Sequence, residues 1–202
     1  MEIKERIIVE SGQFFGKYGI RSITMDFLAE EMAISKRTIY EHFRDKDTLL
    51  LEVIKYYREQ HSTEALRIIN ESDNAIEALF RIMRIMIRQM KQVNPLFFHD
   101  LKKYHTSIFI TLTEKSDFRD YTLTLKLLET GARQGVFRTS LNISIVNATR
   151  HVLFDLFNPD SSFSLADYDR KEMFDHIIIP YFRGISTERG VKLIEDFRKI
   201  LD

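Results

Sequence analysis

The sequence contains no cysteine, and only 7 of its 202 residues are glycine and 3 are proline. Without cysteine the chain can form no disulfide, no thiol nucleophile and no thiolate metal site, which fits a reducing compartment. No apolar run approaches the roughly 18 residues that a membrane-spanning helix needs. The N-terminus mixes charges of both signs into its apolar residues, unlike a signal peptide. We therefore expect a soluble, cytoplasmic protein with no membrane partner.

Net charge is absent too, because 30 basic residues balance 30 acidic ones. No overall field draws the chain toward nucleic acid or a membrane surface, so any such attraction must come from a local patch. The sequence also lacks a glycine-rich phosphate loop and a G-x-S-x-G nucleophile turn. His99 and His105 are spaced so that they face different sides of a helix rather than one metal ion. We expect no enzyme activity, no metal and no cofactor.

Apolar residues recur at three- and four-residue intervals along almost the whole chain, which indicates an all-α fold of about nine or ten helices. The first helix should end at Gly19, with a second behind Thr24 and a third behind Ser35. Short helices therefore occupy residues 1–48, and longer helices fill residues 49–202. The pattern also predicts one long helix over about 106–134 and a later helix interrupted by Pro180.

The second and third short helices have the spacing of a helix-turn-helix unit, whose second helix can enter the DNA major groove. The turn between them is 32–34, and the second helix lies in the stretch AISKRTIYEHF. Ile39 and Phe43 stand four apart and should face the core. The residues that then project outward, where base edges would lie, are Lys36, Arg37, Tyr40 and Glu41. Such charges can also form a merely solvated helix face.

From Phe15 to Val53 the sequence resembles the tetracycline-repressor (TetR) family of transcriptional regulators. The positions that carry the resemblance are Gly19, Thr24, Ala29, Ser35, Thr38, Ile39, Tyr40, Phe43, Lys46, Leu49 and Leu50. One position departs from the pattern, because the turn that often holds glycine holds Ala33 here. If Ala33 is left-handed, the alanine costs about 1 kcal/mol.

The resemblance implies roles for individual residues. Tyr40 and Lys46 correspond to contacts with backbone phosphates, and Thr24 assists them through its hydroxyl or the amides it caps. The positions from which family members reach bases are Lys36, Arg37, Thr38 and His42. The family also implies a homodimer on a palindromic, double-stranded DNA operator. Repression is the commoner role in the family, although the sequence does not separate a repressor from an activator.

The rest of the chain, residues 49–202, would form the helical ligand-sensing and dimerisation domain behind the DNA-binding domain at residues 1–48. The segments that match the family's dimer helices are 142–158 and 169–183, whose apolar stripes could alternatively be intramolecular core. Residues 74–134 are rich in Met, Phe and Tyr, which can line a pocket for a small apolar or aromatic effector but also form ordinary core. The candidate ligand-binding residues are Phe97, His99, Tyr104, Tyr121 and His151.

One rival hypothesis remains open at this point. A helical ligand-binding or adaptor protein that has lost sequence-specific DNA recognition would keep the buried anchors Ile39 and Phe43. It would have no reason to keep an exposed cationic pair such as Lys36 and Arg37. The sequence therefore favours the DNA-binding regulator.

Overall fold

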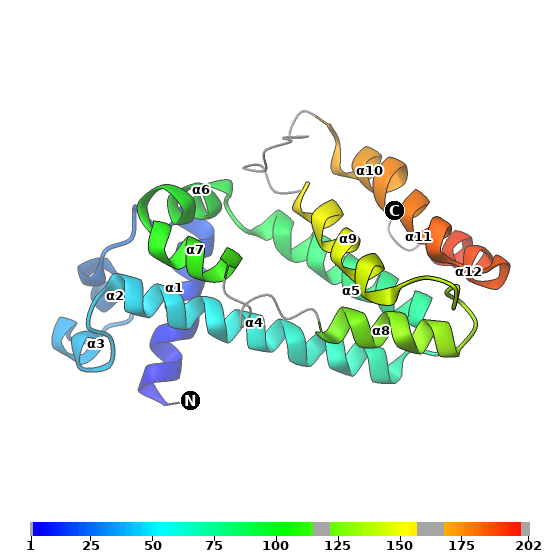
Figure 1. Ribbon diagram of the computed structural model, residues 1–202. Coiled ribbons are helices and arrows are strands. Elements are labelled where there is room, and N and C mark those ends of the chain that lie inside the picture. Colours follow the sequence, from blue (N-terminus) through cyan, green and yellow to red (C-terminus); the bar gives the residue numbers. More distant parts are fainter. Residues whose placement is uncertain (1, 115–121, 157–167, 199–202) are drawn as a thin grey trace. The chain divides into compact units, whose positions relative to one another are not determined.

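The computed structural model describes residues 2–114, 122–156 and 168–198 (Figure 1). The all-α fold expected from the sequence is confirmed, because these residues form helices joined by turns and contain no β-strand. The chain packs as two compact units. Unit 1 comprises Met1–Glu64 with Ile87–Asp120, and unit 2 comprises Ala65–Met86 with Tyr121–Asp202. The expected functional boundary at residue 48 falls inside unit 1 and stays a prediction.

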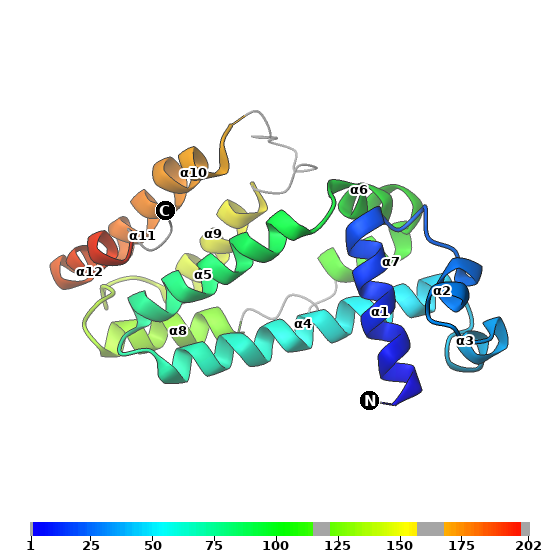
Figure 2. The ribbon, with the colours of Figure 1, turned by 180° about the vertical axis from the view of Figure 1, so that it is seen from behind.

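Unit 1 combines the three N-terminal helices with the first part of α4 and with two later helices. These are α1 (Ile3–Tyr18), α2 (Met25–Glu31), α3 (Lys36–His42), α4 (Lys46–Glu71), α6 (Pro95–Tyr104) and α7 (Thr106–Glu114). Figures 1 and 2 show α6 beside α1 in both views, and the two helices are in contact.

Unit 2 begins with the end of α4 and the first part of α5 (Ala75–Gln92). The remaining elements are α8 (Thr122–Arg133), α9 (Ile143–Asp155), α10 (Arg170–Met173), the π-helical turn η2 (Phe174–Ile178), α11 (Ile179–Ile185) and α12 (Glu188–Arg198). Within this unit α8 packs against α9, and α11 packs against α12.

The short helices of unit 1 begin at the residues that the sequence predicts as caps. The Thr24 hydroxyl accepts a hydrogen bond from the Phe27 amide at 3.1 Å, and the Ser35 hydroxyl accepts one from the Thr38 amide at 3.0 Å. Each bond satisfies one of the amides that a helix N-terminus leaves without an intrahelical partner. Since α2 and α3 are only 7 residues long each, these caps fix where the helices start.

The core of unit 1 joins the N-terminal helices to α6 and α7. Phe15, Ile39 and Phe43 are at most 1% exposed, and they belong to the same apolar cluster as Leu101 of α6 and Ile108 of α7. The first 48 residues alone would leave part of this cluster in water. Helices α1, α2 and α3 are therefore held in place by residues far along the chain.

One expected helix differs from the structure, and another agrees with it. The helix predicted over 106–134 is described as α7 and α8, and the residues between them lie outside the described part. The interruption expected at Pro180 is confirmed as the π-helical turn η2, which directly precedes the first turn of α11. Proline has no amide proton and its ring clashes with the preceding helical turn, so the helix adopts this wider turn.

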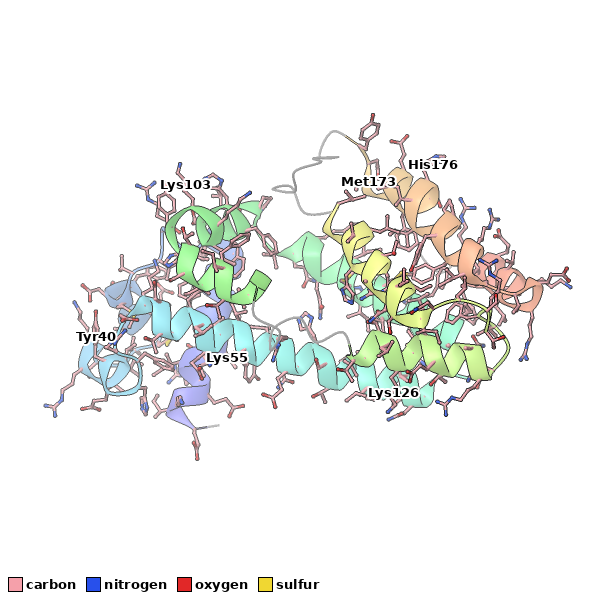
Figure 3. All side chains as sticks on the ribbon, in the orientation of Figure 1. Tyr40, Lys55, Lys103, Lys126, Met173 and His176 are labelled. Carbon is pink, nitrogen blue, oxygen red and sulfur yellow. The ribbon has the colours of Figure 1, made fainter. Side chains whose placement is uncertain are left out.

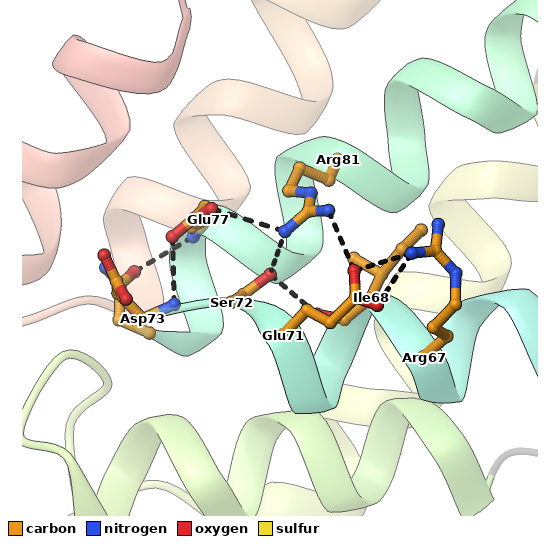
Figure 4. A network of polar contacts seen from close by, with 8 residues as sticks. Arg67, Ile68, Glu71, Ser72, Asp73, Glu77 and Arg81 are labelled. Carbon is orange, nitrogen blue, oxygen red and sulfur yellow. Dashed lines mark hydrogen bonds and ion pairs between the residues drawn. The ribbon is translucent and has the colours of Figure 1, made fainter.

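In unit 2 a polar network fixes the corner between α4 and α5 (Figure 4). The Glu71 carboxylate accepts hydrogen bonds from Arg67 on α4, at 2.6 Å, and from Arg81 on α5, at 3.5 Å. Arg81 also donates to the Ser72 hydroxyl at 3.2 Å. Because the bonds cross from one helix to the next, they hold the direction in which α5 leaves α4.

The turn between α2 and α3 places Ala33 in the left-handed region, with φ of 52°. Alanine is strained there because its Cβ approaches the backbone carbonyl, whereas glycine is not. The turn keeps this geometry because Ile34 on its far side donates a backbone hydrogen bond to the carbonyl of Ala29 at 3.0 Å and packs against the core.

We expect Ala33→Gly to raise the free energy of unfolding by about 0.5–1 kcal/mol, since it removes the strain while leaving the buried packing intact. Ala148→Gly is the matched control, because Ala148 is also exposed but lies within the right-handed helix α9. It should lower stability by about 0.5–1 kcal/mol. Urea unfolding measures both, and a loss of stability in Ala33→Gly would contradict the strain.

Candidate nucleic-acid interface

Helix α3 is anchored by two buried side chains on one face. Ile39 is 0% exposed and Phe43 is 1% exposed. On the other face the Arg37 side chain is 86% exposed and Tyr40 is 44% exposed, and Figure 3 shows Tyr40 at the surface of α3. The prediction that α3 buries its apolar pair and presents its cationic tip to solvent is confirmed.

Both cations at this tip are engaged by acids in the free protein. The Lys36 ammonium lies 2.6 Å from a carboxylate oxygen of Asp26 on α2, and this hydrogen bond raises the pKa of Lys36. Arg37 Nε lies 2.9 Å from a carboxylate oxygen of Glu41, one turn along α3. Exposed ion pairs of this kind contribute little to stability because water screens them. A phosphate or a base edge can therefore replace either acid at small cost.

The remaining predicted base-reading residues lie beside these cations on α3. Thr38 is half-buried, and its hydroxyl shares a hydrogen bond of 2.8 Å with the Ser35 hydroxyl. His42 is exposed, with its ring centre 6.3 Å from that of Phe43. The structure thus brings Lys36, Arg37, Thr38, Tyr40 and His42 together on one short helix.

Lys46, the other predicted phosphate contact, sits at the start of α4 and is half-buried. Its ammonium donates to the carbonyl of Ile20 at 2.5 Å and lies 5.9 Å from the ring centre of Phe15. Burial lowers the pKa of Lys46, while the carboxylates of Asp100 and Asp47 oppose that shift. Lys46 therefore links the turn after α1 to the first turn of α4. Its predicted contact with phosphate stays a prediction.

The N-terminus of α4 is capped by Asp45. Its carboxylate accepts a hydrogen bond from the Thr48 amide at 2.8 Å and another from the Thr48 hydroxyl at 2.7 Å. These bonds, together with the nearby Arg44 guanidinium, lower the pKa of Asp45 to about 2. The cap fixes the start of α4, the helix that follows α3.

The candidate ligand residues on α6 take different positions. Phe97 is half-buried and packs against the core of unit 1, whereas His99 is exposed. Tyr104 is 43% exposed, and its hydroxyl accepts a hydrogen bond from Arg21 at 2.8 Å. All three belong to unit 1, together with α1, α2 and α3.

The candidate His151 lies on α9 in unit 2, within a polar group that links α9 to α8. Its Nε2 is 3.3 Å from the Thr124 hydroxyl and 2.7 Å from a guanidinium nitrogen of Arg150. The same hydroxyl donates to the amide oxygen of the buried Asn147 at 2.7 Å. His151 therefore belongs to a different unit from the three candidates on α6. The last candidate, Tyr121, lies outside the described residues.

Sequence reasoning missed several contacts that shape this surface. Glu41 stands four residues after Arg37, so helical spacing alone could have indicated their ion pair. Asp26 and Tyr104 gave no such signal, because the partners Lys36 and Arg21 meet them through the tertiary fold. Asp26 belongs to another helix, and Tyr104 stands 83 residues from Arg21.

Two other kinds of feature are absent from the residues that the structure describes. These residues contain no group of three or more His, Asp or Glu side chains placed to hold a metal ion. Nor does any helix among them combine the length and apolar character that crossing a lipid bilayer requires.

The fold and this surface define a class of protein, the helix-turn-helix transcriptional regulators with a helical second part. The family model for bacterial regulatory proteins of the tetR family matches residues 7–53. The HTH-type transcriptional regulator YvaF of Bacillus subtilis (strain 168) is 25% identical over 185 residues, which cover 91% of this chain and 96% of that protein. YvaF is known only as an uncharacterised member of this class.

Solved structures share the fold. A transcriptional regulator from Saccharomonospora viridis, crystallised with choline, has a TM-score of 0.69 at 19% identity, covering 92% of this chain and 98% of that one. A TetR-family regulator from Marinobacter aquaeolei VT8 has a TM-score of 0.67 at 16% identity, covering 100% of this chain and 99% of that one. The chain is thus similar to TetR-family transcriptional regulators, in sequence through residues 7–53 and in fold through these solved structures.

The Asp45 cap generates a prediction about pH. Asp45→Ala should lower the free energy of unfolding by about 1 kcal/mol at pH 6, because it removes an N-cap. Since the folded pKa of Asp45 is about 2, below the ordinary 3.8, its stabilisation is present above pH 4 and is lost as the pH falls toward 2. The difference in free energy of unfolding between the unmodified protein and Asp45→Ala should therefore become smaller as the pH falls from 4 toward 2.

Urea unfolding at pH 6, 4 and 2.5 measures this difference. Asp45→Asn is the matched control, since asparagine also caps helices but carries no charge. Asp45→Asn should lose little stability at pH 6. The difference in free energy of unfolding between Asp45→Asn and Asp45→Ala should not vary with pH. If the difference in free energy of unfolding between the unmodified protein and Asp45→Ala grows in acid, the Asp45 carboxylate does not have the lowered pKa assigned to it.

Proposed function

We propose that this protein binds a palindromic DNA operator as a homodimer in the cytoplasm, represses transcription there, and leaves the operator when a small, largely apolar or aromatic effector binds. It acts as a regulator without catalytic chemistry, as TetR-family proteins typically do. Residues 1–48 form the DNA-binding part, and residues 49–202 carry effector sensing and dimerisation.

The observation that carries this proposal is the orientation of α3. Two buried anchors, Ile39 and Phe43, leave the cationic N-terminal part of the helix facing solvent. Arg37 can donate two hydrogen bonds to guanine O6 and N7, a contact that discriminates by about 1–3 kcal/mol. Tyr40 and Lys46 would hold the backbone phosphates, and Thr24 would assist at the start of α2.

One reading helix contacts few bases, so specificity requires a second copy. Two copies related by a two-fold axis would place their α3 helices about 34–36 Å apart, one turn of DNA, and would read a palindrome. The proposed dimer helices lie within 142–158 and 169–183. The single chain already buries Phe174, Ile178 and Phe182 of the second segment, so these three side chains serve its own core.

Helix α9 offers the apolar surface that a second copy would cover. Ile145 is 64% exposed and Val152 is 66% exposed, and their spacing of two helical turns puts them on the same face. Large apolar side chains gathered on one helix face mark association sites in soluble proteins. This exposed pair supports dimerisation through α9.

Effector release requires two dimer states, of which only one holds the α3 helices at the DNA spacing. An effector shifts the equilibrium only if it prefers the other state. The relative from Saccharomonospora viridis was crystallised with choline, a small molecule. For this chain the Met- and aromatic-rich residues 74–134 favour a more apolar effector. Helix α4 contributes residues to both units, and it is the element proposed to transmit effector binding to the DNA-binding part.

The rival proposal is a helical adaptor that has lost DNA recognition. It predicts no selective advantage for an exposed Lys36 and Arg37 at the tip of α3, and it would bind no duplex selectively. A gel-shift assay with the DNA upstream of the protein's own coding region separates the two.

Selection of bound duplexes from random DNA tests the role of α3. Arg37→Ala should change the preferred base at one position of each half-site and weaken the original operator about 10- to 100-fold. Tyr40→Phe removes only a hydroxyl and should weaken binding to all DNA sequences equally, by a few-fold. Lys126→Gln on α8 of unit 2 is the matched surface control and should change neither the base preference nor the affinity. Equal losses on every sequence for Arg37→Ala would contradict the assigned base contact.

The dimer surface has its own test. Ile145→Asp places a carboxylate in the apolar face of α9, so the protein should shift from dimer to monomer in sedimentation at micromolar concentration and lose operator affinity more than 10-fold. Leu96→Asp on α6, where the leucine is 52% exposed, is the matched control and should remain dimeric. A dimer that withstands Ile145→Asp and Val152→Asp together would exclude this face.

A further inference from the structure

Outside α3, the described residues place two exposed cations on a single tyrosine. The Arg21 guanidinium donates to the Tyr104 hydroxyl at 2.8 Å, and its carbon lies 4.7 Å from the centre of the tyrosine ring. The Lys103 ammonium lies 5.4 Å from the same ring centre. Arg21 follows α1, whereas Lys103 and Tyr104 end α6, and Figure 3 shows Lys103 at the surface of α6.

The backbone beneath this cluster is held firmly. The amide of Arg21 donates to the Asp100 carboxylate at 2.8 Å, and Asp100 is only 6% exposed. Gly19 permits this approach, since its φ is +81° and a Cβ there would lie 3.0 Å from both the Asp100 carboxylate and the Leu96 side chain. The turn after α1 and the C-terminal half of α6 therefore form one fixed surface.

The charges of the cluster leave an excess of positive charge at the surface. Asp100 and Asp47 both act on the half-buried Lys46, which lies against Ile20, the residue before Arg21. Among the described residues neither Arg21 nor Lys103 forms an ion pair. The two cations lie within about 10 Å of each other, since both sit near the same ring, and they repel unless an anion lies nearby.

The position of the cluster indicates which anion. Arg21 stands three residues before Thr24 and next to the carbonyl that binds Lys46, and both of those residues are proposed phosphate contacts. A DNA strand carries one phosphate for about every 3.4 Å of helix axis, so several phosphates span the distance between the two cations. Two long cations on separate segments of the chain suit a repeating backbone charge better than a single small anion.

We propose that Arg21 and Lys103 contact operator phosphates beside those held by Tyr40 and Lys46, so that α6, outside the DNA-binding part at residues 1–48, supplies part of the DNA interface. This inference rests on the proposed DNA-binding function. It adds two backbone contacts per subunit that carry no sequence information, and it makes operator affinity depend on where α6 sits.

The salt dependence of operator binding tests the proposal. Each neutralised phosphate contributes about 0.9 to the slope of log affinity against log salt concentration. Arg21→Gln and Lys103→Gln should therefore each reduce the magnitude of the slope by about 0.9 for every phosphate released, and should weaken binding about 3- to 10-fold at about 0.15 M salt. The probe is the duplex obtained by selection from random DNA, and the base preference should not change.

Matched variants separate charge from packing. Lys103→Arg keeps the charge and should keep the slope, whereas Lys126→Gln removes a cation from unit 2 and should leave the slope unchanged. If Arg21→Gln with Lys103→Gln keeps the full slope while Arg37→Ala still alters base preference, the α6 contact is wrong and the proposed function stands. If the unmodified protein selects no duplex, the proposed function itself fails. Binding of inorganic phosphate or an acidic peptide without any change in the DNA slope would also overturn the α6 contact.

Discussion

The burial of Ile39 and Phe43 is the interaction on which the proposed DNA-reading surface depends. Helix α3 has only 7 residues, too few to be stable in isolation. Its position is therefore determined by these two anchors and by the Ser35 cap, not by helix propensity. Because both anchors lie on one face, the opposite face with Arg37 has to point into solvent. The exposed cations follow from packing.

The anchors themselves require more than the DNA-binding residues. Their cluster includes Leu101 of α6 and Ile108 of α7, and the Asp47 carboxylate at the start of α4 lies 2.6 Å from Nδ1 of His105, which is 9% exposed, between those helices. A segment of about 50 residues buries too small a fraction of its surface to be stable without such additions. The compact unit is consequently larger than the part proposed to read DNA, and α6 takes part in the fold and, as proposed, in the interface.

Local signals made much of this predictable. Thr24 and Ser35 cap the helices they were expected to cap, and the alternation of apolar residues correctly separated the buried Ile39 from the exposed Arg37. The contact between Arg21 and Tyr104 could not be predicted, because the two residues lie 83 positions apart and no local spacing pattern relates them. The ligand candidates suffered from the same limit: Met- and aromatic-rich helices look alike whether they line a pocket or fill a core, and Phe97 packs into the core of unit 1.

The acids beside the reading cations have a consequence for selectivity in the proposed regulator. Asp26 and Glu41 engage Lys36 and Arg37 in the free protein, so any DNA must compete with carboxylates already in place. An operator offers base edges that match these side chains, and the hydrogen bonds to them compensate for the lost ion pairs, whereas random DNA offers phosphates without matching base edges. Breaking the pairs costs the same free energy in both complexes, whereas only the operator returns base-specific hydrogen bonds. Those hydrogen bonds therefore set the ratio of specific to non-specific affinity, which is the quantity that decides occupancy among many competing sites. A chain with no net charge can in this way favour one operator without strong attraction to DNA in general.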